Sequence, residues 1–131
     1  MSRLKPGIKG ELKLKVEFEH TAAKFGSGFV EVLSTPMLVA IMEGAAKNCV
    51  QEYLPEGQTT VGTRVDIKHL AATPIGMEAT AKAELIEVDG RRLVFKVEAY
   101  DEKEKIGEGS HERFIIDIEK FMKKNQAKKQ S

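Results

Sequence analysis

The longest apolar stretch of the chain runs from Pro36 to Ala46, and Glu43 is its one charged residue. At about 100° per residue, these apolar positions surround a helix on all sides instead of forming one stripe, which is typical of a buried helix. Proline suits the first turn of a helix, and the Ser-Thr pair before it can cap the free amide groups. The pattern therefore predicts a long central helix within residues 34–53, with a carboxylate buried inside it.

Five other segments alternate apolar and polar residues, which is the period of a half-buried strand. The third segment changes phase at Ile86, which predicts a β-bulge, and Asp89 with Gly90 predicts a tight hairpin turn after it. The predicted strands cover residues 12–18, 58–70, 77–88, 93–99 and 106–117. The predicted inward face of the second strand carries Val61, Thr63, Val65, Ile67 and His69.

The order of these elements predicts an α+β fold in which one five-stranded antiparallel sheet wraps around one long helix. Residues 20–32 keep no period and carry Phe25 and Phe29 on either side of a Gly-Ser-Gly hinge. This segment is either a mobile lid over a pocket or an ordinary connection with one Phe in the core. We expect a single domain over residues 1–118 and a solvated basic tail over residues 119–131, where five Lys accompany one Glu.

The charge and cysteine content limit the classes of partner and the cellular location that we expect for this protein. The chain has 131 residues with 21 basic and 20 acidic side chains, so its net charge of +1 gives no reason to expect nucleic acid or an anionic membrane. No secretion signal and no long apolar run is present, and Cys49 is the only cysteine, which together predict a cytoplasmic protein without an internal disulfide. The three histidines are dispersed and no phosphate-binding glycine loop is present, so neither a metal site nor a bound cofactor is expected.

Two polar residues stand out against their apolar surroundings. Glu43 must be paired, hydrogen-bonded or protonated, because an unpartnered buried carboxylate costs several kcal/mol. His69 points with the apolar residues at the end of its predicted strand, just before a turn. Each residue is either part of the core or part of a functional site, and the pattern alone leaves both interpretations open.

Three stretches resemble the hotdog-fold thioesterases, and within them the fluoroacetyl-CoA thioesterase branch. They are STPMLVAIMEGA, TVGTRVDIKHLAATPIG and VDGRRLVFKVEAYDEKEKIGEGSHERF, in this order over roughly residues 30–121. The resemblance implies the hotdog fold and a catalytic group of Thr35, Glu43 and His69. It also implies a backbone contact from Gly62 near the acyl group and a substrate-binding role for Arg113, which could instead pair with Glu112 or with a buried carboxylate.

The implied function is an acyl-CoA thioesterase that hydrolyses a small acyl thioester to the free acid and CoA, with the CoA ester as substrate and no cofactor. His69 would act as general base, Glu43 as nucleophile or as base for water, and Thr35 would orient it or bind the carbonyl oxygen. Phe29 is a candidate to cover the acyl group. The segment that carries it is shorter than the lid of fluoroacetyl-specific members, so the resemblance gives no basis to predict discrimination between fluorinated and ordinary acyl groups.

The resemblance also implies at least a homodimer, with the pockets at the interface between the two sheets. Three alternatives are open. A non-catalytic acyl-CoA-binding or regulatory hotdog domain would bind CoA esters without turnover. A hotdog hydratase would carry its His and acid in a different motif, and a protein-interaction module would leave Glu43 and His69 without a purpose.

Overall fold

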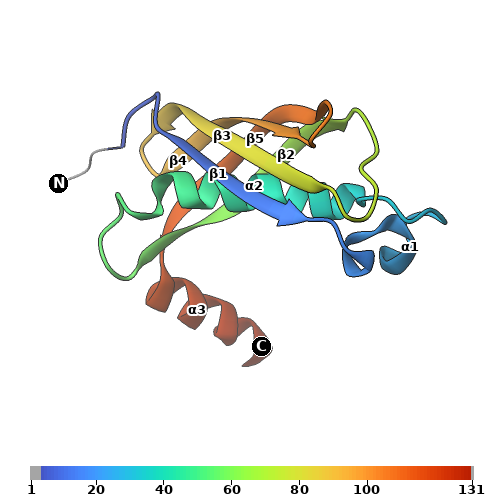
Figure 1. Ribbon diagram of the computed structural model, residues 1–131. Coiled ribbons are helices and arrows are strands. Elements are labelled where there is room, and N and C mark those ends of the chain that lie inside the picture. The colour runs from blue at the N-terminus through green and yellow to red at the C-terminus, as the bar shows by residue number, and fades with distance from the viewer. Residues whose placement is uncertain (1–3, 131) are drawn as a thin grey trace.

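The computed structural model describes residues 4–130, and in it a curled five-stranded sheet wraps around one long helix (Figure 1). The sheet is formed by β1 (Lys9–Lys15), β2 (Gln58–His69), β3 (Glu78–Asp89), β4 (Arg92–Tyr100) and β5 (Lys105–Asp117). The central helix is α2 (Thr35–Gln51). Two short helices connect β1 to α2, namely a 3-10 turn (Phe18–His20) and α1 (Ala22–Phe25). Two more follow β5, namely α3 (Ile118–Ala127) and a second 3-10 turn (Lys128–Gln130).

The strands lie in the order β1-β3-β4-β5-β2, and every neighbouring pair is antiparallel. This arrangement confirms the predicted fold class. It leaves β1 and β2 as the two edges of the sheet, and β2 is one of the longer strands.

The core lies between α2 and the inner face of the sheet. One stripe of α2 is buried, with apolar residues three and four positions apart: Leu38, Ile41, Met42, Ala45, Ala46, Cys49 and Val50. The facing positions of β3 are small, namely Ala79, Ala81 and Ala83, and those of β4 are larger, namely Leu93, Phe95 and Val97. The helix approaches β1 so closely that a Cβ on Gly10 would lie 2.6 Å from the Cα of Cys49.

The apolar composition of α2 predicted a helix that is buried on all sides, but the structure leaves one of its faces open. Pro36 and Ala40 are exposed, and Val39 and Glu43 are only half-buried, so one face of α2 is open in the single chain. The sheet curls around the opposite side of the helix, and five strands are too few to enclose it. An apolar face of the central helix is therefore left uncovered.

Two bulges set the direction of side chains. The ladder between β3 and β4 shifts between Leu85 and Glu87, which confirms the predicted bulge. A second shift, which the pattern did not reveal, lies between Gly62 and Arg64 where β2 pairs with β5. Because a bulge inserts one residue and changes which side chains face inward, Thr60 is buried at 4% exposure where the sequence predicted that Val61 faces the core.

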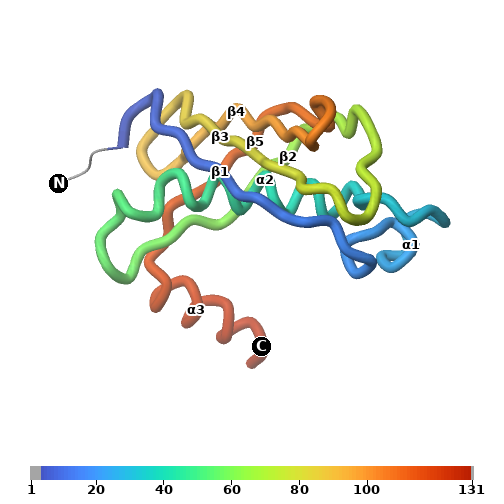
Figure 2. Tube along the Cα trace, viewed as in Figure 1, coloured from blue at the N-terminus to red at the C-terminus, as the bar shows by residue number. Residues whose placement is uncertain are grey.

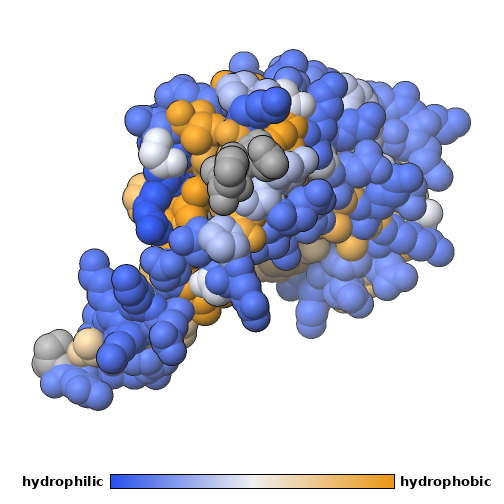
Figure 3. All heavy atoms as spheres, turned by 90° about the vertical axis from the view of Figure 1, so that its left-hand side faces the viewer, coloured by the Kyte–Doolittle hydropathy of each residue, from blue (hydrophilic) through white to orange (hydrophobic). Residues whose placement is uncertain are grey.

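The ends of the domain differ from expectation in two places. The first strand covers Lys9–Lys15 instead of residues 12–18. After it, the amide of Val16 still donates to the carbonyl of Met77, and the chain then turns into the 3-10 helix that contains Phe18. The basic tail forms α3, which has no buried residue and projects away from the sheet (Figure 2). Apolar side chains gather at the end of the molecule where α3 begins, whereas α3 itself is mostly hydrophilic (Figure 3). Within residues 4–130, no helix is long and apolar enough to cross a membrane.

Candidate active site

Thr35 and His69 come together at the first turn of α2. The hydroxyl of Ser34 caps the helix by accepting a hydrogen bond from the amide of Met37 at 3.1 Å, which makes Thr35 the first helical residue. His69 is the last residue of β2, and its Nδ1 lies 2.7 Å from Oγ1 of Thr35. Two of the three predicted catalytic residues are thus in direct contact, although they are 34 residues apart in the chain.

The other ring nitrogen of His69 is free. Nε2 is buried, and no hydrogen-bond partner for it lies among the described residues. Burial lowers the pKa of His69, and a contact with the backbone of Ala71 opposes this effect to a smaller extent. The ring is therefore neutral near pH 7 and has one nitrogen available for proton transfer.

A cavity of about 610 Å³ opens beside this pair. It is bounded by parts of the segment 22–33, by the start of α2 and by residues 69–72. Phe29, the candidate cover for the acyl group, is fully exposed and does not line the cavity in the single chain. Its proposed role stays a prediction.

Glu43 lies two turns further along α2. Eight residues of α-helix rise about 12 Å, so Glu43 and Thr35 of one chain are at different levels of the helix. The carboxylate is 37% exposed, and among the described residues both of its polar contacts are made by Oε1. The single chain therefore does not bring the three predicted catalytic residues into one group.

Arg113 is the main partner of Glu43. Its Nη1 donates to Oε1 of Glu43 at 3.3 Å, and it is only 6% exposed. Thr60 holds the rest of the guanidinium, accepting from Nε through its hydroxyl at 2.7 Å and from Nη2 through its carbonyl at 2.9 Å. Burial lowers the pKa of Arg113, while the charge and hydrogen bond of Glu43 oppose this. Of the partners considered, Arg113 thus pairs with the partly exposed Glu43 carboxylate, and its substrate-binding role stays a prediction.

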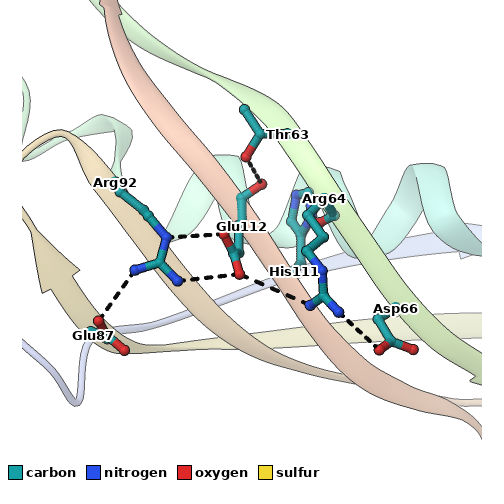
Figure 4. Close-up of polar contacts among 7 residues, drawn as sticks. All are labelled: Thr63, Arg64, Asp66, Glu87, Arg92, His111 and Glu112. Atoms are coloured by element: carbon teal, nitrogen blue, oxygen red, sulfur yellow. Dashed lines mark hydrogen bonds and ion pairs between the residues drawn. The ribbon is translucent and has the colours of Figure 1, made fainter.

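Glu112, the other partner considered for Arg113, points to the opposite face of the sheet. There it accepts from Nε of Arg92 at 3.0 Å and lies 3.9 Å from Nη1 of Arg64 (Figure 4). These cations, above all the hydrogen bond from Arg92, lower the pKa of Glu112. Arg92 also pairs with Glu87, and Arg64 also pairs with Asp66. These ion pairs form a network on the outer face of β4, β5 and β2 (Figure 4).

Gly62 lies directly over the carboxylate of Glu43. A Cβ at this position would be 2.5 Å from Oε1 of Glu43 and 3.2 Å from Cε1 of His111. A larger residue here would force the Glu43 carboxylate to shift, so Gly62 shapes the site. A contact between its N–H and an acyl group stays a prediction.

His111 is a member of this cluster that sequence reasoning missed. It is 1% exposed, and its Nε2 lies 3.2 Å from Nη1 of Arg113 and 3.9 Å from Oε1 of Glu43. The signal was present, because residues two apart on a strand share a face and His111 is two residues before Arg113. Within residues 4–130, no group of three or more metal-ligating side chains is found.

Comparison with known proteins identifies the family and agrees with the fold. The family model of the fluoroacetyl-CoA-specific thioesterases matches residues 16–119. The fluoroacetyl-CoA thioesterase of Streptantibioticus cattleyicolor is 44% identical over 93 residues, which cover 71% of this chain and 67% of that protein. A crystallographic structure of a fluoroacetyl-CoA thioesterase superimposes with a TM-score of 0.90 at 35% identity, covering 95% of this chain and 97% of the other.

A more distant structure has the same architecture. A thioesterase-superfamily protein from Thermus thermophilus, 29% identical, matches with a TM-score of 0.90 over 99% of this chain and 96% of its own. The match of the family model over most of the chain, the curated relative and the shared fold lead to one conclusion: this chain is a hotdog-fold thioesterase and belongs to the fluoroacetyl-CoA-specific thioesterase family.

Proposed function

We propose that this protein hydrolyses the thioester bond of small acyl-CoA molecules, and that Thr35, His69 and Glu43 carry the reaction. Structures of related thioesterases were determined with acetyl-CoA and with fluoroacetate and CoA, which supports a short acyl group on CoA as the substrate class. The observation that carries the proposal is the 2.7 Å contact between Thr35 and His69, with a free nitrogen of His69 beside a cavity.

The complete site is proposed to form between two copies of the chain. Residues 62–66 of the edge strand β2 are all exposed, and an exposed edge strand is a template for pairing with another strand. Antiparallel pairing of two β2 strands about this stretch brings the Gly62 end of one toward the His69 end of the other. The open face of α2 would be covered at the same time, which explains why its composition predicts complete burial.

Thr35 and His69 are assigned the proton transfer. When Nδ1 of His69 donates to the hydroxyl of Thr35, the ring is held in one orientation and Nε2 keeps a free lone pair. Because the pKa of His69 is lowered, this nitrogen is free of a proton at neutral pH and can accept one from water. Thr35 then has the orienting role.

Glu43 is assigned the contact with the acyl carbon or its attacking water. Arg113 holds Oε1, so Oε2 is left as the reacting oxygen. In the covalent route, Oε2 attacks the thioester carbon, the carbon–sulfur bond breaks with CoA as the leaving thiolate, and water then hydrolyses the anhydride with His69 taking the proton. In the direct route, water attacks the carbonyl while Glu43 accepts its proton, and the carbon–sulfur bond then breaks with CoA as the leaving thiolate. Both routes give the free acid and CoA.

The test is the release of free CoA from a panel of acetyl, propionyl, branched and aromatic CoA esters. We expect turnover of short acyl esters by the wild type and a loss of about 10³-fold in kcat for Glu43→Gln, since it removes the reacting carboxylate. Glu52→Gln, an exposed change near the end of the same helix, is the matched control and should leave kcat unchanged.

Saturable binding of the esters without any turnover would instead identify a non-catalytic acyl-CoA-binding domain. A change in enoyl absorbance without release of thiol would identify a hydratase. Either result would contradict the proposed hydrolysis.

A further inference from the structure

His111 is a buried titratable group for which the proposed reaction has no direct use. It lies on β5 between its strand neighbours Val65 and Phe95, and its ring centroid is 6.2 Å from that of Phe95. At 1% exposure it cannot contact a substrate. Its polar contacts nevertheless lead directly to Glu43.

The two ring nitrogens of His111 have fixed roles. Nδ1 lies 2.8 Å from the carbonyl oxygen of Arg64, which can only accept, so Nδ1 carries a proton. Nε2 lies 3.2 Å from Nη1 of Arg113, which can only donate, so Nε2 carries none. Only the neutral ring with its proton on Nδ1 satisfies both contacts.

Arg113 transmits this arrangement to the carboxylate. Thr60 binds Nε and Nη2, and the remaining nitrogen, Nη1, lies between Nε2 of His111 and Oε1 of Glu43. His111 therefore supplies the acceptor that fixes the Glu43-facing side of the guanidinium. Without that acceptor, one N–H of the buried Nη1 would lose its partner, and the guanidinium would be held only by Thr60 and by the partly exposed carboxylate.

The charges around His111 come from three elements. Glu43 faces it from α2, Arg113 from β5 and the Arg64 carbonyl from the bulge of β2, while Glu112 acts on it from the opposite face of β5. Burial is the largest influence and lowers the pKa of His111. Arg113 adds to this effect, while the carbonyl and the two carboxylates oppose it. Protonation would place an N–H donor against the N–H of Nη1 that faces the ring, so that this contact would be lost while Nη1 kept its bond to Glu43.

We propose that neutral His111 is a positioning residue for thioester hydrolysis, which holds Arg113 on Glu43 and thereby aims the carboxylate. The inference rests on the proposed function, because Glu43 is the group being positioned. It also connects the edge strand to the site, since the carbonyl that fixes the ring belongs to the bulge of β2.

Two substitutions separate the contacts of the ring. His111→Gln can place its amide oxygen near the position of Nε2 and keep an acceptor for Arg113, whereas His111→Asn can reach only the Arg64 carbonyl. We expect kcat to fall about 10- to 100-fold in His111→Asn, as for a misplaced reacting group, with KM little changed. His111→Gln should recover most of that loss. Circular dichroism and the oligomeric state control for folding.

The pH profile gives a readout that a purely structural role would not move. If both His69 and His111 must be neutral, log kcat of the wild type falls in acid with a slope approaching two, and that of His111→Gln with a slope of about one. Equal kcat values in folded Gln and Asn variants, whether high or low, would overturn the proposal, and so would an unchanged slope.

Failure of the proposed function is a separate result, because the wild type would then release no CoA from any ester, and the positioning role would fall with it. If the variants do not fold, ¹⁵N NMR of wild-type histidines decides. A proton on Nδ1 of His111, with the Arg113 side-chain signals shifting as the ring titrates, supports the proposal. A proton on Nε2 overturns it.

Discussion

The two halves of the site are built in opposite ways. Thr35 and His69 lie at the open end of α2, make one hydrogen bond to each other and leave Nε2 of His69 free beside a cavity. Glu43 lies in a cluster in which Arg113 and His111 are buried and bound through nearly every polar atom. In the proposed reaction, the first half exchanges a proton and the second holds a carboxylate in one direction.

This contrast indicates why neither half is sufficient alone. In the covalent route, a histidine without a carboxylate has no reacting oxygen to support. A fixed carboxylate without a base then has no acceptor for the proton of the water that hydrolyses the anhydride. Because the two halves lie about 12 Å apart along one helix, the most economical way to unite them is to take one half from each of two chains.

Mixing two inactive variants tests that comparison with the largest expected effect. Glu43→Gln and His69→Ala should each be nearly inactive as homodimers. A dimer of one with the other contains one intact site if the halves come from different chains, so random mixing should restore about one quarter of the wild-type activity. No recovery in confirmed heterodimers would show that both halves act within one chain.

Loss of the free base comes next in size. His69→Ala removes the proton acceptor and the partner of Thr35, so kcat should fall about 10²- to 10⁴-fold while the fold is retained. Steady-state release of CoA measures the loss, and circular dichroism checks the fold. Full activity of a folded His69→Ala protein would exclude His69 from the reaction.

Gly62→Ala tests the rigid half without changing any functional group. The added methyl group would lie 2.5 Å from Oε1 of Glu43, so the carboxylate must move away from Arg113. We expect kcat to fall about 10²-fold through this misplacement, with a small change in the free energy of unfolding, because Gly62 is exposed. An unchanged kcat would show that the position of Oε1 is not critical.

The same contrast explains what could be predicted from the sequence. Local patterns are sufficient for β3 and β4, whose inward residues Ala79 to Leu85 and Leu93 to Ala99 alternate as expected and are buried. Glu43 and His69 were noticed because each is polar in an apolar context. The resemblance to the family then supplied Thr35, which no periodicity distinguishes.

The rest depends on contacts between distant residues. The bulge between Gly62 and Arg64 is a property of the pairing of β2 with β5, and it reverses the inward face of the first half of β2. His111 was overlooked because its partners, the Arg64 carbonyl and Arg113, are defined only once β2 and β5 are paired. The open face of α2 has the same origin, because the apolar pattern of a helix does not reveal whether its own sheet or a second chain covers it.

The smallest expected effect is on stability in mild acid. Burial lowers the pKa of both His69 and His111 in the folded protein, while in the unfolded chain they titrate near 6.5. Between these values the unfolded state binds more protons, so stability is fully present above about pH 6.5 and falls as the pH drops toward the folded-state pKa, by at most about 1.4 kcal/mol per pH unit for each histidine. Urea unfolding at pH 7.5 and 5.5 measures this loss. It should be smaller in His111→Gln, which removes one of the two groups, and an equal loss in both proteins would contradict the burial of a neutral His111.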